Sequence, residues 1–332
     1  MAGFSSMDDF VAKVTVDGNF KRTDWNKNFL PTAAAVAGEW HSLFRGGGNP
    51  GADAILNTGT NLAFQALTDA TANATGIQHG GDVSPLTKHI VNASAFSAAA
   101  TTMPAVMMLV DLLGWYRVTT VTTTTAQTTN NTVTLPRYTD GAGVQAFFVN
   151  TNATALGAGT PNLSLGYTNS AGTAGRATPA TLPVGKTAAA NGLILHSGTG
   201  AGKYGPFVPL AAGDSGIRSI QTIQNSTSYV SGEYAVCLCK PLLTLPMTTI
   251  GVAAERDLMN QIPSLPQIQD GACLNWLLYS GAATPVNSAF YGHVDFAWGQ
   301  AEGAKLWRLS VIIPYFAKRQ DRGTAAALSA KA

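Results

Sequence analysis

From about residue 101 onward, short apolar or alternating runs of strand length are separated by Gly, Pro and Asn. Residues 217–223 and 234–239 alternate between two sets of side chains, which is the pattern of a strand with one buried face. This pattern is typical of an antiparallel β architecture. It predicts strands at 106–113, 116–124, 133–136, 144–150, 163–168, 193–196, 216–223, 233–240, 274–279, 290–298 and 306–314.

The first hundred residues are less regularly patterned. Residues 5–14 combine a serine N-cap with acidic residues and apolar side chains on one face, which predicts a short helix. Residues 21–31 gather charged and aromatic side chains and end at a proline, which favours an arm lying across a neighbouring molecule. Glycine-rich loop signals at 46–51 and 79–82 follow, so we expect irregular structure up to about residue 100.

These patterns define an expected architecture. The fold class is mainly β, with an antiparallel, jelly-roll-like β-sandwich body over residues 101–318 and an irregular, partly helical N-terminal region over residues 1–100. Within the body we expect a hairpin at 118–134 and a helix at 253–262. The small and polar residues 319–332 are expected to form a flexible tail.

Composition adds a statement about partners. Charged residues make up only 11% of the 332 residues, about half the usual share in a soluble domain. Lys and Glu normally keep an isolated surface soluble, so a long folded chain with so few of them is expected to cover much of its exterior with partners. The net charge of +2 is spread thinly, which argues against a nucleic-acid surface. The composition therefore indicates a subunit of an assembly.

Few segments suit catalysis or cofactor binding. The segment 196–204 has glycines and a lysine, but it lacks the spacing and the hydroxyl residue of a phosphate loop. The histidines never fall at the spacing of a metal-binding pair. His293 and Asp295 alternate on a predicted strand, where a polar surface is a simpler interpretation than a base beside a carboxylate. We therefore expect no catalytic residue, no cofactor, no metal site and no enzyme activity.

The sequence gives no indication of export or of a membrane partner. Its N-terminus lacks the basic and apolar stretches of a secretory signal. The most apolar segment, 103–115, is too short to span a bilayer. Cys237, Cys239 and Cys273 are odd in number, and we interpret them as small buried hydrophobic residues.

The candidate functional residues are therefore interface residues. Arg137 and Asp140 are a cation and an acid in a chain with few of either, and an ion pair inside an assembly contact is one expectation for them. A solvated hairpin connection is the alternative. Trp25 and Trp307 are flanked by charge, and Lys27 lies close to Trp25 in the same charged arm. Tryptophan often anchors interfaces, so these side chains are also expected to face a partner.

Several segments carry a resemblance to a known group of proteins. They are the capped N-terminal helix, the Thr/Ala/Gly-rich strands, Asp24-Trp-Asn-Lys27, Leu135-Pro-Arg-Tyr-Thr-Asp-Gly141 and Val252-Ala-Ala-Glu-Arg-Asp-Leu-Met259. With these features over most of its length, the chain resembles structural proteins of tailed-bacteriophage virions. The resemblance implies a head-associated protein that decorates and cements the capsid shell or builds it. It assigns no binding residue.

The leading hypothesis is a capsid-associated cement or decoration protein that stabilises the shell by bridging subunits. Its partners are expected to be phage capsid subunits and copies of itself, as a dimer or trimer, in a virion assembled in the host bacterial cytoplasm. One alternative is the major capsid (shell) protein, although such proteins usually carry a long charged helix that this sequence lacks. A second alternative is a carbohydrate-binding surface or tail protein, for which Trp and Asn on β loops are suitable.

Overall fold

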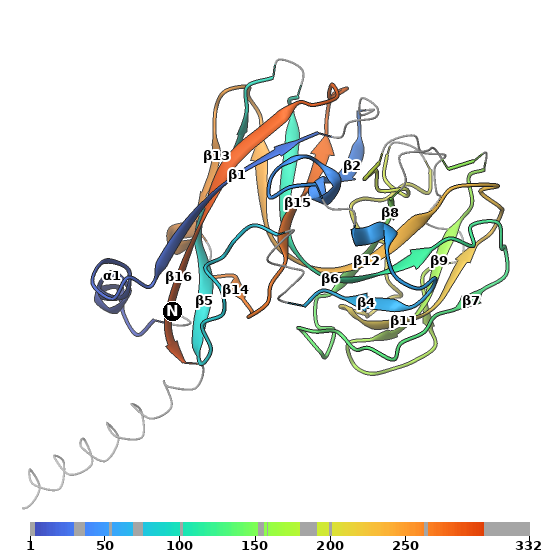
Figure 1. Cartoon of the computed structure of the whole chain (residues 1–332), viewed down its shortest axis with the longest axis horizontal. Coiled ribbons are helices and arrows are strands. Elements are labelled where there is room, and N and C mark those ends of the chain that lie inside the picture. Colours follow the sequence, from blue (N-terminus) through green and yellow to red (C-terminus); the bar gives the residue numbers. More distant parts are fainter. Residues whose placement is uncertain are drawn as a thin grey trace, which may run out of the picture.

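The computed structural model describes residues 4–29, 37–52, 55–68, 76–99, 102–151, 156–157, 159–179, 191–198, 201–261 and 265–301. Within these ranges the chain is mainly β, and its strands form three antiparallel sheets (Figure 1). The mainly β, antiparallel sandwich class expected from the sequence is therefore confirmed.

The first sheet joins strands from both ends of the chain. Its order is β13 (Ala254–Asp257), β5 (Leu86–Ser97), β16 (Ala289–Ala301), β1 (Phe20–Asn28) and β3 (Gly48–Asn49), and β14 (Gln267–Ile268) pairs with β5. The nine residues of β1 all have a partner in β16, so the segment expected to be a free arm is mostly an internal strand.

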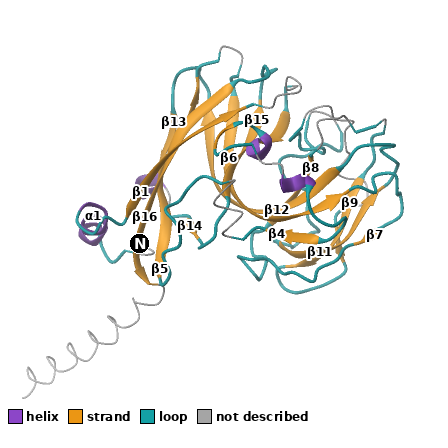
Figure 2. Cartoon of the chain, in the orientation of Figure 1, coloured by secondary structure: helices purple, strands orange, loops and turns teal. Residues whose placement is uncertain are grey.

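The central sheet contains the longest strands. Its order is β2 (Glu39–Ser42), β15 (Leu274–Ser280), β6 (Ala105–Val118), β12 (Tyr234–Met247) and β8 (Gln145–Asn150), and β4 (Phe64–Ala66) pairs with β6. The small sheet has the order β10 (Arg176–Ala177), β9 (Leu163–Asn169), β11 (Ile217–Asn225) and β7 (Gln127–Thr128). Figure 2 shows β6 and β12 running from the first sheet toward the small sheet.

One face of the central sheet packs against both other sheets. Alternate residues at the start of β6, such as Met107 and Leu109, belong to a core shared with the first sheet. Further along the same strand, Leu113 and Tyr116 belong to a core shared with the small sheet. Asp111 lies between these two apolar stretches of β6.

The opposite face of the central sheet is covered by irregular chain. Val110, Leu112 and Trp115 of β6 pack there with Phe44 and Leu56. These last two side chains come from the short helices η1 (Leu43–Arg45) and η2 (Ile55–Asn57). Because both faces are covered, β6 and the start of β12 are buried on both sides, and the expectation of a single buried face for residues 234–239 is wrong.

Helix α1 (Met7–Thr15) lies at the edge of the first sheet, against β16 and β1. The Ser6 hydroxyl accepts a hydrogen bond from the Asp9 amide at 3.0 Å, so the helix begins where the sequence predicts. The predicted helix at 253–262 is wrong in its first half. There β13 pairs with β5, and only α3 (Leu258–Gln261) is helical.

Other local predictions have mixed outcomes. The strands expected at 144–150, 163–168, 216–223, 233–240, 274–279 and 290–298 are confirmed, with ends that differ by a few residues. The strand at 106–113 is part of β6, whereas of the one at 116–124 only residues 116–118 belong to β6 and the rest is wrong. The hairpin at 118–134 is wrong, because β6 ends at Val118 and β7, the next strand in this segment, pairs with β11. The strand at 133–136 is wrong, because these residues lie in a loop. Leu193 and Ile194 form only isolated bridges. The expected strand at 306–314 and tail at 319–332 lie outside the described residues.

The expected irregular structure up to residue 100 is also corrected. Strand β5 lies within residues 1–100, yet it pairs along most of its length with β16. A boundary at residue 100 therefore does not coincide with a boundary between sheets. Buried polar side chains such as Lys88 and Ser94 interrupt the apolar pattern of β5, which is why its sequence does not resemble a core strand.

Candidate functional site

Trp25 and Lys27, expected to face a partner, are buried within one chain. Trp25 is 3% exposed and packs against Trp276, with ring centroids 4.9 Å apart. Lys27 is fully buried, and its Nζ donates hydrogen bonds to the carbonyls of Gly46 at 2.7 Å and Pro50 at 3.0 Å. These carbonyls satisfy the buried ammonium group, so Lys27 holds the 46–51 loop against β1. Neither side chain is available for an exposed contact, which corrects the expectation.

Arg137 forms an ion pair, but not with Asp140. Its Nε and Nη2 donate to the two carboxylate oxygens of Asp111 at 2.9 and 2.7 Å, and both side chains are almost fully buried. Asp140 is exposed, and its Oδ1 accepts a hydrogen bond from the Ala142 amide at 3.0 Å. The expected Arg137–Asp140 ion pair is therefore wrong. Asp140 lies instead in an exposed turn of the chain. Trp307 lies outside the described residues.

The Asp111–Arg137 pair ties a loop to the central sheet. Arg137 also donates to the carbonyls of Leu67 at 3.0 Å and Leu112 at 2.9 Å. Asp111 accepts a further hydrogen bond from the Cys273 amide at 2.9 Å. Burial raises the pKa of Asp111, and the adjacent guanidinium opposes this rise. The pair anchors the loop that contains Arg137 directly over β6.

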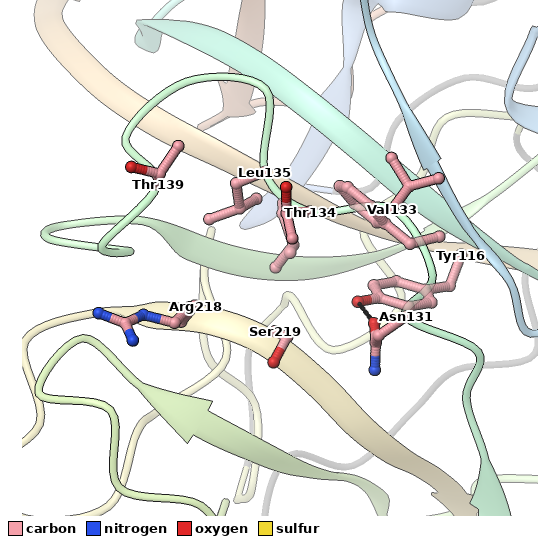
Figure 3. Close-up of a pocket in the computed structure, with 10 residues that line it drawn as sticks. Tyr116, Asn131, Val133, Thr134, Leu135, Thr139, Arg218 and Ser219 are labelled. Atoms are coloured by element: carbon pink, nitrogen blue, oxygen red, sulfur yellow. Dashed lines mark hydrogen bonds between the residues drawn. The ribbon is translucent and has the colours of Figure 1, made fainter.

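That loop forms one wall of a pocket, shown in Figure 3. The opposite wall is β11, with Arg218 and Ser219. The space between them amounts to about 500 Å³ and is open to solvent on one side. The pocket is lined by Phe64, Tyr116, Asn131, Val133, Thr134, Leu135, Thr139, Arg218, Ser219 and Leu238.

The floor of the pocket is apolar, and the Tyr116 hydroxyl in it is hydrogen-bonded within the protein. The Tyr116 hydroxyl donates to Asn131 Oδ1 at 2.7 Å and accepts from the Ile220 amide at 3.2 Å, so both of its hydrogen-bonding roles are occupied (Figure 3). Burial raises the pKa of this hydroxyl. Arg218 is the one charged residue in the lining, which gives the pocket a positive end. Its chemistry suits an apolar group that carries a negative charge.

A second polar group lies on the first sheet, around the His293 and Asp295 pair. His293 Nδ1 is 2.8 Å from the Ser94 hydroxyl, but His293 Nε2 is 4.0 Å from Asp295 Oδ2. Both Asp295 oxygens instead accept from Arg22, at 2.9 and 3.0 Å. The carboxylate is therefore engaged by the guanidinium and not by His293, while Ser94 and Asp295 are buried, so this group is only partly at the polar surface that the sequence favoured. Ser94 was not predicted, because β5 carried no strand signal.

The pocket residues were not predicted from the sequence either. They come from β4, β6, β11, β12 and the 131–139 loop, so only the tertiary fold brings them together. Arg218 belonged to a predicted alternating strand, and Val133 to a predicted strand that is in fact part of this loop.

The described part of the chain contains no group of three His, Cys, Asp or Glu residues placed to hold a metal ion. None of its helices is long and apolar enough to cross a membrane. Cys237, Cys239 and Cys273 form no disulfide and are buried, which confirms their interpretation as small core residues.

Comparisons with known proteins identify no relative: no protein-family model, no curated protein and no solved structure matches this chain.

Proposed function

We propose that this chain is a structural protein of a phage particle, a capsid-associated cement or decoration protein that bridges shell subunits. The observation that carries the proposal is a chain with only 11% charged residues, about half the usual share. Its exposed surface also includes large apolar side chains in three separate parts of the chain: Val16 is 80% exposed, Val230 64% and Val252 59%. A surface with so little charge favours a protein whose exterior is covered by neighbours.

The use of charge inside the chain supports the same proposal. Arg22, Arg117 and Arg176 pair with Asp295, Glu233 and Asp214, and each pair links two segments distant in sequence. Together with Asp111–Arg137, these pairs use eight of the 38 charged residues, and each braces segments of one sheet or its adjoining loops. Internal ion pairs of this kind are compatible with a mechanical role in which many modest contacts between subunits are repeated over a lattice.

The proposal is tested on purified particles of the phage that encodes the chain. Quantitative peptide mass spectrometry is expected to find the chain in a copy number comparable with that of the shell subunit. Mild chaotrope treatment is expected to release it while the shell persists. Absence of the chain from particles contradicts the proposal, a handful of copies indicates a tail component, and release only together with the shell indicates a shell protein.

One observation favours the second alternative, a carbohydrate-binding surface or tail protein. A further pocket of about 740 Å³ on the small sheet is lined mainly by uncharged amide and hydroxyl side chains. They include Asn162, Ser164, Thr178, Thr222 and Gln224. Such groups suit hydroxyl-rich ligands, although no aromatic side chain lines this pocket for a sugar ring to stack on. Specific binding of the purified chain on a glycan array supports this candidate over a cement role.

A further inference from the structure

Helix α1 is amphipathic, but it is only partly covered by its own chain. None of its residues is buried, and only Phe10 and Val14 pack against the core of the first sheet. Met7 is 51% exposed and Val11 is 49% exposed. These two residues are four positions apart and share the apolar face of the helix with Phe10 and Val14, but they lie at its exposed edge, where the sheet covers them only in part.

The carboxylate of Asp8, next to Met7 in the sequence, is free to pair with a cation of another molecule. Asp8 is exposed and makes no ion pair or side-chain hydrogen bond within the described residues, whereas the neighbouring Asp9 carboxylate accepts from Ser5 at 2.7 and 2.9 Å. A nine-residue helix is below the length of about 12–15 residues at which isolated helices become stable in water. Such a short helix depends on packing of its apolar face, which here is supplied through Phe10 and Val14 while Met7 and Val11 remain about half exposed.

The pocket beside Arg218 has the complementary chemistry. Its rim includes Val133, which is 47% exposed, and Leu135 lines the interior. Three arginines in this half of the molecule, Arg117, Arg137 and Arg176, have carboxylate partners. Arg218 is exposed and has no such partner among the described residues.

We propose that α1 of one copy docks on this pocket of a second copy, with Met7 and Val11 entering the apolar part and Asp8 meeting Arg218. The two surfaces lie at opposite ends of the molecule in Figure 1, α1 beyond the first sheet and the pocket between β4 and β11, so one chain does not bring them together. The inference rests on the proposed function, because it specifies the contact between copies. Each copy offers one helix and one pocket, so a closed ring satisfies every contact.

Cross-linking tests the contact directly. Val11→Cys and Val133→Cys proteins are prepared separately, mixed and mildly oxidised; the three native cysteines are buried and do not compete. A disulfide-linked dimer of the two variants is expected. The matched control mixes Val11→Cys with Val230→Cys, an exposed site outside the pocket, and is expected to give little product. Equal yields in both mixtures, or no product with Val133→Cys, overturn the inference.

Charge exchange provides an independent test. Asp8→Lys or Arg218→Glu alone is expected to weaken self-association, measured by analytical ultracentrifugation, about fivefold to tenfold. The combined variant is expected to recover most of the loss. Arg256→Glu on β13 is the matched control and leaves association unchanged. All these positions are at least partly exposed, so folding is retained and is verified by circular dichroism.

The outcomes separate this inference from the proposed function. A chain that is monomeric at every concentration, or whose two single charge variants associate like the original, contradicts the α1 contact. If such a chain is still present in particles in lattice copy number, the cement proposal stands and only the proposed contact fails. Specific cross-linking without any presence in particles has the opposite meaning, since it supports the contact and rejects the virion role.

Discussion

Asp111 and Arg137 form a bidentate ion pair, with N–O distances of 2.7 and 2.9 Å, at the place where the two main cores of the molecule meet. On one side of Asp111 along β6 lies the core shared with the first sheet, and on the other side lies the core shared with the small sheet. The pair joins the central sheet to the loop that forms the pocket wall. It therefore links the packing of the whole chain to the geometry of the candidate site.

Removing one member of this pair is expected to be costly. Asp111→Asn leaves the guanidinium of Arg137 buried without its counter-charge, which lowers the free energy of unfolding by about 3–5 kcal/mol. Replacing both residues, as Asp111→Leu with Arg137→Met, is expected to recover a large part of this loss because no charge remains buried. Urea unfolding measures both. A loss below about 1 kcal/mol for Asp111→Asn, the range of an exposed pair, is incompatible with this account.

Gly292 is required by close packing in the first sheet. A Cβ atom there lies 1.9 Å from the carbonyl oxygen of Ser94 and 2.8 Å from the ring of Trp25. Gly292→Ala is therefore expected to reduce stability by about 1–3 kcal/mol or more, as overpacking does. Gly47→Ala is the matched control, since a Cβ there has nothing within 4 Å. Similar unfolding midpoints for the two variants refute this packing argument.

Strands of the body were predictable where one face is apolar and buried and the other is more polar and more exposed. In β9, Leu163, Leu165 and Tyr167 are buried while Ser164 and Thr168 between and beside them are only half-buried, so the sequence alternates as the burial does. β5 was missed for the opposite reason: Lys88 is buried through hydrogen bonds to backbone carbonyls, including that of His79 at 2.8 Å. A buried polar residue with local partners gives the same sequence signal as an exposed one.

The candidate site was less predictable than the strands. Arg137 was identified as unusual, but its partner depends on how a loop folds back over β6, which no short-range pattern encodes. One signal was present: Asp111 lies inside the apolar segment 103–115, and a carboxylate in such a run needs a nearby cation. The pocket itself depends on five separate segments, so its lining emerges only from the fold.

Buried neutral histidine makes stability depend on pH. His196 is fully buried, and desolvation lowers its pKa to about 3, with a smaller contribution from Lys203. The folded chain therefore takes up this proton less readily than the unfolded chain, and stability falls as the pH drops from about 6.5 toward 3. Replacing His196 with Leu is expected to reduce this slope, measured as urea midpoints between pH 7 and pH 4.

The slope is not expected to vanish in that variant. His79 has a pKa lowered to about 4 by burial and by Lys88, so it contributes in the same direction. An unchanged slope after the His196 substitution contradicts the assignment of the effect to this residue.

The Asp214 carboxylate is expected to make stability depend on pH in a more acidic range than the two histidines do. Hydrogen bonds from Arg176, Tyr167 and Asn169 lower its pKa to about 2. A carboxyl with a lowered folded pKa stabilises the chain above its ordinary value near 4, and this contribution is lost as the pH falls toward 2. Asp214→Asn is expected to remove this part of the acid sensitivity. Unfolding midpoints at pH 5, 3 and 2 measure the effect, and parallel curves for the two proteins refute it.

The central claim is that neighbouring subunits cover the charge-poor surface of this chain in a phage particle. A reconstruction of that particle at side-chain resolution tests it most directly. The account predicts density for this fold repeated over the capsid, with exposed apolar residues such as Val16 and Val252 covered by adjacent subunits. A particle without this density, or one in which these surfaces face solvent in every copy, contradicts it.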